Sequence, residues 1–260
     1  MQKIYLLIFT ILIAVLLTAC GNGQADIDNN PADSPDENAE TAIFKGKVAG
    51  MVGESALIIP LAEDTSSSLY LLPLMNIALS GPNAEIDSSL IKPGAVVEIS
   101  YDGTIMESYP AQFGAATSLR VVKEEGDLVG LYLNVLCDLY DVDPGLNDGI
   151  SILAFDLNAA ENLSAAEKSA LLYMAGAEYG LETMAGTFDE LCEIGLIDKE
   201  ALYFESGLLV SFSVQDNGET SFSFSADKWR GGLGAYFFTD CKAKLNGTSW
   251  SYTIGGQAIS

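Results

Sequence analysis

The densest group of potential cation ligands in the sequence is an acidic stretch, CDLYDVDPGLNDG. Hard cations such as Ca²⁺ prefer several oxygen ligands from a flexible loop, and the DVD spacing is how an EF-hand loop begins. The match then fails, because Leu146 stands where that loop needs glycine and Ile152 where it needs glutamate. A turn with capped backbone donors is the simpler interpretation. Calcium binding stays open as an alternative, with four candidate ligands: Asp138, Asp141, Asp143 and Asp148.

Two other stretches hold side chains suited to binding. GTIMESYPAQ can present Glu107, Tyr109 and Gln112 on one loop, which suits a glycan or a peptide. DKWRGGLGAYFF places Trp229 beside Arg230, and these residue types combine a large contact area with directional polar ends. Structural packing of the aromatic rings is the alternative in both stretches. These five residues are the candidate ligand contacts.

Several catalytic classes are excluded by composition. The chain has no histidine, which removes Ser-His-Asp and Cys-His nucleophile pairs and the commonest catalytic zinc ligand. Its four cysteines lack CxxC spacing. Cys137, Cys192 and Cys241 stand among apolar residues, which favours buried thiols, although three disulfide pairings stay open. No catalytic residue is assigned.

Acidic residues outnumber basic ones by 36 to 12, for a formal net charge of −24. Nucleic acid is therefore excluded as a partner, because phosphate binding needs a basic footprint. A carboxylate-dependent hydrolase is a further alternative. That chemistry needs one carboxyl group with a raised pKa inside a pocket, and no pair stands out in the sequence.

The N-terminus has the anatomy of an export signal. Lys3 precedes an apolar run that is too short for a transmembrane helix. The segment LTAC then resembles the lipobox of bacterial lipoproteins, in which the cysteine receives a diacylglyceryl group and becomes the mature N-terminus. The resemblance implies a signal peptide at residues 1–19 and lipidation of Cys20, whose two acyl chains give stable membrane attachment. An ordinary secretory signal and an uncleaved anchor are the alternatives.

Beyond Cys20 the composition predicts a tether and two domains. Residues 20–41 are acidic and contain no base, so we expect a disordered tether. A charged, glycine-containing break places the domain boundary after residue 125. Within 42–125, short strand-like runs alternate with Gly, Pro and Ser turn signals, which predicts a small OB-like β-barrel.

The second domain, 126–260, mixes helices and hairpins. Ser164 with Glu167 and Thr187 with Glu190 form capping boxes, which predict helices from about 165 to 179 and up to Gly195. Paired strand-like runs follow, with turn signals DNG and NG between them. The predicted fold class of the chain is therefore α+β, with antiparallel hairpins at the C-terminal end.

Two sets of motifs resemble known lipoproteins. FKGKV and IKPGAVVEISYDGTIMESYPAQF resemble the YobA-like family of small Gram-positive lipoprotein domains, a domain of unknown function. This resemblance implies an OB-like barrel on a lipid tether and no established activity. DPGLNDGI, LSAAEKSAL, GTFDEL and KWRGGLGAYFFTDC are similar to C-terminal regions of uncharacterised clostridial-type lipoproteins.

The expected function is non-catalytic binding at the cell envelope. The chain is predicted to be anchored by Cys20 at the extracytoplasmic face of the cell membrane. The expected partner is an envelope protein, a peptide or a glycan.

Overall fold

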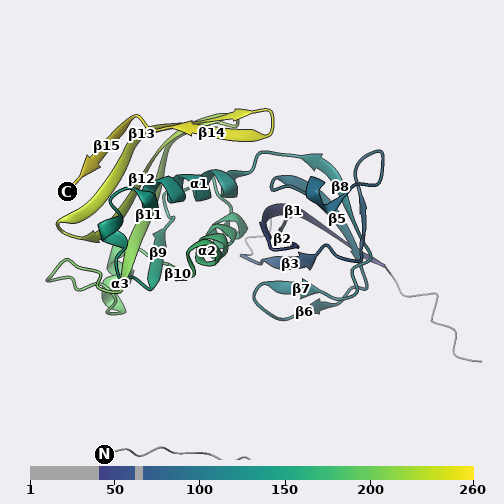
Figure 1. Cartoon of the computed structure of the whole chain (residues 1–260), viewed down its shortest axis with the longest axis horizontal. Coiled ribbons are helices and arrows are strands. Elements are labelled where there is room, and N and C mark those ends of the chain that lie inside the picture. The colour runs from purple at the N-terminus through teal and green to yellow at the C-terminus, as the bar shows by residue number, and fades with distance from the viewer. Residues whose placement is uncertain (1–40, 62–66) are drawn as a thin grey trace, which may run out of the picture. The chain divides into compact units, whose positions relative to one another are not determined.

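The computed structural model describes residues 41–61 and 67–260 (Figure 1). The predicted signal peptide, Cys20 and nearly all of the predicted tether lie outside these residues. Among the helices of the described part, none has the length and apolar character that a bilayer crossing requires.

The first sheet contains eight strands of mixed direction in the order β4-β8-β5-β1-β2-β3-β7-β6. The ladders β3/β7 and β4/β8 are parallel, and the other neighbours are antiparallel. A short 3-10 helix, η1 (Ser88–Leu90), precedes β5. The strands are β1 (Ala42–Val52), β2 (Ser55–Pro60), β3 (Tyr70–Pro73), β4 (Ala78–Ser80), β5 (Ala95–Tyr101), β6 (Ile105–Met106), β7 (Ala111–Phe113) and β8 (Ser118–Glu124).

Only residues 74–77 separate β3 from β4. Yet β4 pairs with β8 at one edge of the sheet, whereas β3 lies between β2 and β7 near the other edge. The sheet therefore curls toward itself. In the described residues no ladder between β3 and β8 closes it into a barrel. Its interior is mainly aliphatic, and at one side Phe113 packs against the partly buried Phe44, Tyr70 and Tyr101 with ring centroids 5.1, 5.4 and 5.3 Å apart.

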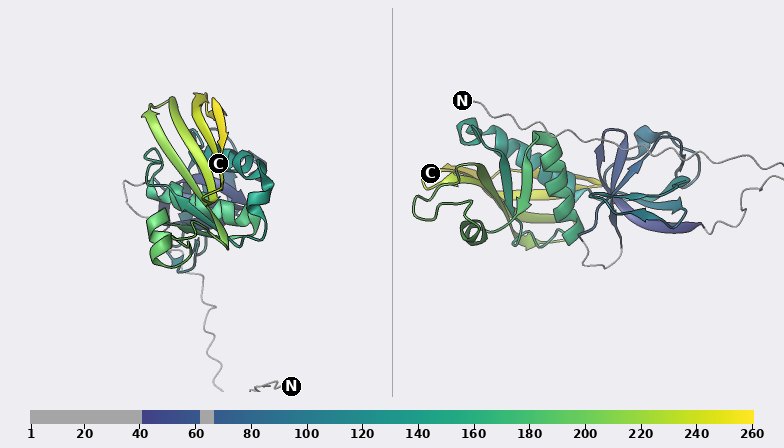
Figure 2. Two further views of the ribbon diagram at one scale, coloured as in Figure 1. Left: turned by 90° about the vertical axis from the view of Figure 1, so that its left-hand side faces the viewer. Right: turned by 90° about the horizontal axis from the view of Figure 1, so that it is seen from below.

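The second sheet contains seven strands and is strongly curled (Figure 2). Its order is β10-β9-β11-β12-β13-β14, with β15 also paired to β13. Strand β9 is parallel to β10 and β11, and the remaining ladders are antiparallel. The strands are β9 (Ile152–Asp156), β10 (Glu182–Ala185), β11 (Gly207–Asn217), β12 (Ser221–Gly231), β13 (Gly234–Asn246), β14 (Ser249–Thr253) and β15 (Gly256–Ile259).

Three α-helices cover the two faces of the second sheet. Helices α1 (Leu128–Asp141) and α2 (Ala165–Tyr179) pack on the face of Leu153 and Val210, whereas α3 (Phe188–Glu193) packs on the opposite face. Both predicted capping boxes are confirmed, at the starts of α2 and α3. The predicted α+β class is confirmed as well, with a high strand content. Helix α1, which follows the N-cap Asp127, was not predicted from the sequence.

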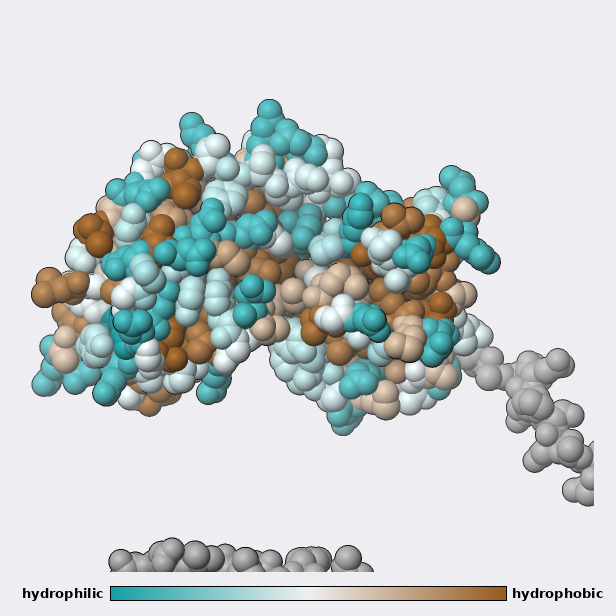
Figure 3. All heavy atoms as spheres, viewed as in Figure 1, coloured by the Kyte–Doolittle hydropathy of each residue, from teal (hydrophilic) through white to brown (hydrophobic). Residues whose placement is uncertain are grey.

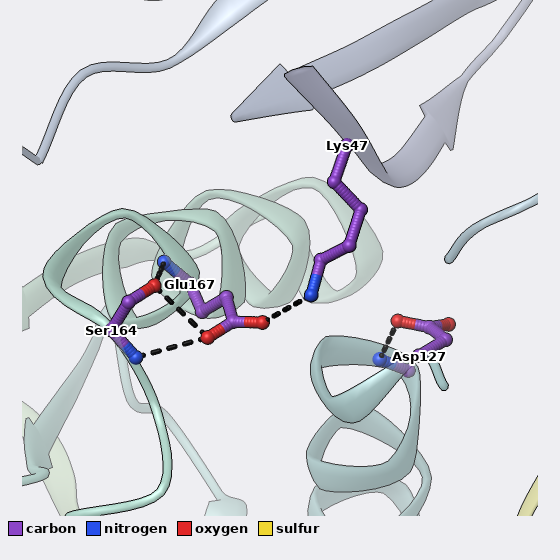
Figure 4. A network of polar contacts seen from close by, with 5 residues as sticks. Lys47, Asp127, Ser164 and Glu167 are labelled. Atoms are coloured by element: carbon purple, nitrogen blue, oxygen red, sulfur yellow. Dashed lines mark hydrogen bonds and ion pairs between the residues drawn. The ribbon is translucent and has the colours of Figure 1, made fainter. Parts of the chain in front are cut away.

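A buried ion pair joins the first sheet to the helix layer (Figure 4). Lys47 of β1 donates to Glu167 of α2 at 2.6 Å, and the two side chains are only 14% and 9% exposed. Burial raises the pKa of Glu167, but Lys47 and hydrogen bonds from Ser164 outweigh it and hold that pKa below its usual value. Around the pair, one apolar cluster extends from β1 and β2 into α1, α2 and the second sheet.

Candidate functional site

The acidic stretch forms the end of α1 and a 3-10 helix, η2 (Pro144–Asn147), and it surrounds an ammonium group. Lys228 of β12 is 1% exposed. Its Nζ donates to the carbonyl oxygens of Tyr140 at 3.0 Å and Asp143 at 3.3 Å, and to Asn147 Oδ1 at 3.1 Å. It also donates to the carbonyl of Val142. Burial lowers the pKa of Lys228 to about 8, which leaves it charged at neutral pH.

The four candidate metal ligands do not gather at one point. Asp138 accepts a hydrogen bond from the Tyr252 hydroxyl. Asp143 adopts a left-handed backbone conformation (φ 44°) before η2. The Asn147 side-chain amide donates to the Tyr140 carbonyl at 2.7 Å. It therefore satisfies a backbone acceptor, whereas the turn interpretation expected capped backbone donors. Within 41–61 and 67–260, no three Asp, Glu or Cys side chains form a group that could hold a metal ion. Calcium binding here stays a prediction.

Arg230 ties three segments together. Its Nη1 donates to the carbonyl oxygens of Leu146 at 2.8 Å and Asp148 at 2.5 Å, and its Nη2 donates to that of Glu205 at 3.0 Å. The guanidinium also lies over the ring of Tyr203, 5.7 Å from its centroid. The side chain that the sequence marks as a ligand contact is thus engaged by the protein's own backbone.

Beside Arg230 lies an open apolar pocket of about 960 Å³, which we call the Leu233 pocket. Leu233 is 95% exposed, and Leu202 and Tyr203 are 46% and 42% exposed. Brown apolar side chains stand among hydrophilic ones over the second sheet in Figure 3. The pocket is lined by Gly145, Leu146, Asp148, Ala201, Leu202, Tyr203, Arg230, Gly231, Gly232, Leu233 and Gly234.

Glycines allow the close approach that shapes this pocket. A Cβ at Gly231 would lie 2.9 Å from Tyr203 Cδ2 and 3.1 Å from the Leu202 carbonyl oxygen. A Cβ at Gly234 would lie 3.0 Å from Leu146 Cδ2. The glycine-rich β12–β13 turn can therefore contact both neighbouring loops while Leu233 projects into solvent.

Trp229 does not join Arg230 in this pocket. Successive residues of a strand point to opposite faces, and Trp229 packs edge-on against Phe188 of α3 with ring centroids 5.3 Å apart. It belongs to the apolar cluster of Leu191, Ile197 and Phe204. These contacts agree with the alternative in which Trp229 packs structurally, and Trp229 does not line the Leu233 pocket.

Glu107, Tyr109 and Gln112 lie on the first sheet, in and beside the β6–β7 connection. All three are exposed, Tyr109 by 69%. The Tyr109 ring meets Tyr173 of α2 edge-on at 6.2 Å. The five candidate contacts thus occupy three separate places.

Sequence reasoning missed a row of polar residues across the second sheet. Ser211 of β11 is paired with Asp156 of β9 on one side and with Asp227 of β12 on the other. Burial raises the pKa of Asp227 to about 6, and nearby Asp156 adds to the rise while a hydrogen bond with Ser211 opposes it. The alternation in SFSFSADK predicts which face Asp227 takes, but only the strand register brings Asp156 to it.

No protein-family model matches the sequence, and neither a curated protein nor a solved structure matches the chain. The two resemblances drawn from sequence motifs therefore stay predictions.

Proposed function

We propose that this chain is a lipid-anchored extracytoplasmic protein whose folded part binds a protein partner through the Leu233 pocket. The observation that carries the proposal is an apolar pocket, about 960 Å³ in volume, one of whose lining residues is a leucine that is 95% exposed. Large apolar side chains on a turn are costly to expose, and such patches commonly mark interaction sites.

The lining favours recognition over catalysis. Only Asp148 and Arg230 among the lining residues are charged. Arg230 is held by three backbone carbonyls, so it is not free to stabilise a transition state or to move a proton. A pocket of this kind offers shape and apolar area rather than a reacting group.

The charge around the pocket selects the partner. The flanking segments 141–148 and 198–205 contain six acidic residues and one base, Lys199. That base is paired with Asp189 at 3.0 Å. A partner segment with an apolar anchor between basic residues would match both the pocket and its rim.

The strand order of the first sheet supports an OB-like barrel as the finer fold. β1 pairs with both β2 and β5, and β5 pairs with β8. Counting β3 and β4 as one interrupted strand gives five strands, because β3 pairs with β2 and β4 pairs with β8. That ring is the arrangement of a partly open five-stranded barrel.

The membrane anchor has its own test. Cys20→Ala should abolish incorporation of a clickable fatty acid and release the protein from the membrane fraction, with Cys241→Ala as the control that keeps both. Lipid labelling that survives Cys20→Ala would contradict the lipoprotein assignment.

The binding proposal is tested with labelled peptides on the full lipidated chain in nanodiscs. A peptide in which leucine alternates with lysine should raise fluorescence anisotropy saturably, and its glutamate counterpart should not. Leu233→Glu should weaken binding about tenfold or more, because it places a charge in the apolar contact. Met75→Glu, at an exposed apolar residue in the β3–β4 turn of the first sheet, is the matched control. Equal binding of both peptides, or no effect of Leu233→Glu, would refute the proposal.

A carboxylate-dependent hydrolase is the second candidate, favoured by the Asp156–Ser211–Asp227 row. Strand spacing places the two Asp Cα atoms about 10 Å apart, a separation within which two carboxyl groups can flank a scissile bond. Hydrolysis of a polysaccharide or peptidoglycan panel that is lost in Asp227→Asn would establish this candidate in place of the first.

A further inference from the structure

A second pocket, of about 550 Å³, lies at the carboxyl ends of the parallel strands β9 and β10, between α2 and α3. We call it the strand-end pocket. The carboxyl ends of parallel strands are where ligands of open α/β sheets generally bind. Leu172, Met184 and Leu191 supply apolar lining. The volume falls in the range of small-molecule sites.

Lys168 of α2 contributes the positive charge of this pocket. The side chain is half-buried. Within the described part of the chain, no hydrogen bond or ion pair satisfies its ammonium group. This is unusual in a protein with 36 acidic residues, because a half-buried ammonium gains from any carboxylate it can reach.

Carboxylates line the same pocket without neutralising Lys168. Asp156 ends β9 and accepts a hydrogen bond from the Asn158 backbone N–H at 3.1 Å. Glu190 is committed to the α3 cap, where it accepts from the Thr187 N–H at 2.8 Å and hydroxyl at 2.9 Å. Glu193 stands one helical turn further along α3. Opposite charges therefore face one cavity without forming an ion pair, which leaves Lys168, Asp156 and Glu193 available to a ligand.

We propose that the strand-end pocket binds a small diamino acid, a ligand with one carboxylate and two ammonium groups on an aliphatic chain. Lys168 receives the ligand carboxylate, Asp156 and Glu193 receive the ammonium groups, and the apolar lining receives the methylenes. The excess of carboxylates over the single ammonium selects a second amine over a neutral side chain. This inference is independent of the Leu233 pocket.

Calorimetry on the full chain in nanodiscs tests it with three probes: L-lysine, cadaverine, which lacks the carboxylate, and L-norleucine, which lacks the second amine. L-lysine should bind saturably and more tightly than either analogue. Lys168→Met should weaken L-lysine binding about tenfold while changing cadaverine binding by less than about twofold, because one charge-assisted contact is lost. Asp156→Asn should weaken both.

Cadaverine binding that survives in Lys168→Met shows that this variant is folded. Lys242→Met removes an exposed lysine outside the pocket and should leave all three titrations unchanged. The proposal is overturned if wild-type protein gives no saturable signal with L-lysine. It is also overturned if Lys168→Met weakens L-lysine and cadaverine equally or neither of them.

Discussion

Lys228 and Lys168 lie in the same half of the chain but differ in burial and in hydrogen bonding. Lys228 is 1% exposed and donates to four oxygen atoms of the loop around η2. Lys168 is half-buried at the strand-end pocket, and within the described residues no atom accepts a hydrogen bond from its ammonium group. The difference separates a cation that organises the fold from one available to a ligand. Sequence cannot make that distinction, because it depends on the acceptors that each ammonium meets.

The largest expected effect comes from breaking the Lys228 cage. Lys228→Met should lower the free energy of unfolding by about 3–5 kcal/mol, because several buried carbonyl groups lose their donor at once. Lys168→Met should change it by less than about 0.5 kcal/mol, since no partner is lost. Urea unfolding followed by circular dichroism measures both. Equal destabilisation in the two variants would remove the distinction between them.

A third lysine, Lys47, also stabilises the fold, because its buried ion pair with Glu167 joins the first sheet to helix α2. Glu167→Gln breaks its ion pair while a glutamine can keep the α2 cap, and we expect a loss of about 2–4 kcal/mol. The pKa of Glu167 is held below its usual value, so its stabilising contribution is present at neutral pH and is lost as pH falls through that lowered pKa.

The matched control for this change is Glu98→Gln, which breaks surface pairs with Arg120 and Lys45. Exposed pairs contribute less than about 1 kcal/mol. Urea unfolding of the two variants at neutral pH makes the comparison. A loss in Glu167→Gln no greater than in Glu98→Gln would show that the buried pair adds nothing to the junction.

Asp227 should show the opposite pH dependence to Glu167. Its pKa is raised to about 6, so the folded state holds the proton more tightly than the unfolded state. Its contribution to stability is therefore full below about pH 4 and lost as pH rises through about 6. Relative to wild type, Asp227→Asn should gain about 1–2 kcal/mol between these limits.

Thermal unfolding of wild type and Asp227→Asn across this pH window gives the difference. The exposed Asp240 provides the control position, where Asp240→Asn makes the same substitution at the surface. A difference between wild type and Asp227→Asn that does not change with pH would mean that Asp227 titrates normally.

The smallest effect on stability is expected at the Leu233 pocket. Leu233→Glu changes a side chain that is 95% exposed, so the unfolding free energy should move by less than about 0.5 kcal/mol. Urea unfolding beside the peptide titration would show binding lost without stability lost. A large destabilisation would mean that Leu233 is a structural residue.

Local features were predictable from the sequence and long-range ones were not. The capping boxes at Ser164 and Thr187 lie within four residues of chain, and both helices start there. Helix α1 was missed because Asp127 caps it without a glutamate three positions on. Instead Gly130 stands there and donates its N–H to Asp127 at 2.9 Å.

The candidate sites depend on contacts between residues that are far apart in the sequence, and motif spacing cannot predict such contacts. Lys228 meets Tyr140 across 88 positions of chain, so the acidic stretch looked like a cation site while its cation was hidden in a distant strand. The strand-end pocket likewise depends on the register of β9 against β10. Arg230 as a ligand contact stays a prediction, and its bonds to three backbone carbonyls could be found only from the fold.

The most direct test of the binding function is site-specific photo-crosslinking of the lipidated protein in its own membrane. A benzophenone amino acid at position 233 should yield one discrete crosslinked species, and excess leucine–lysine peptide should abolish it. The same probe at position 75, in the β3–β4 turn of the first sheet, should yield none. No crosslink from position 233, or one that the peptide does not displace, would contradict recognition through the Leu233 pocket.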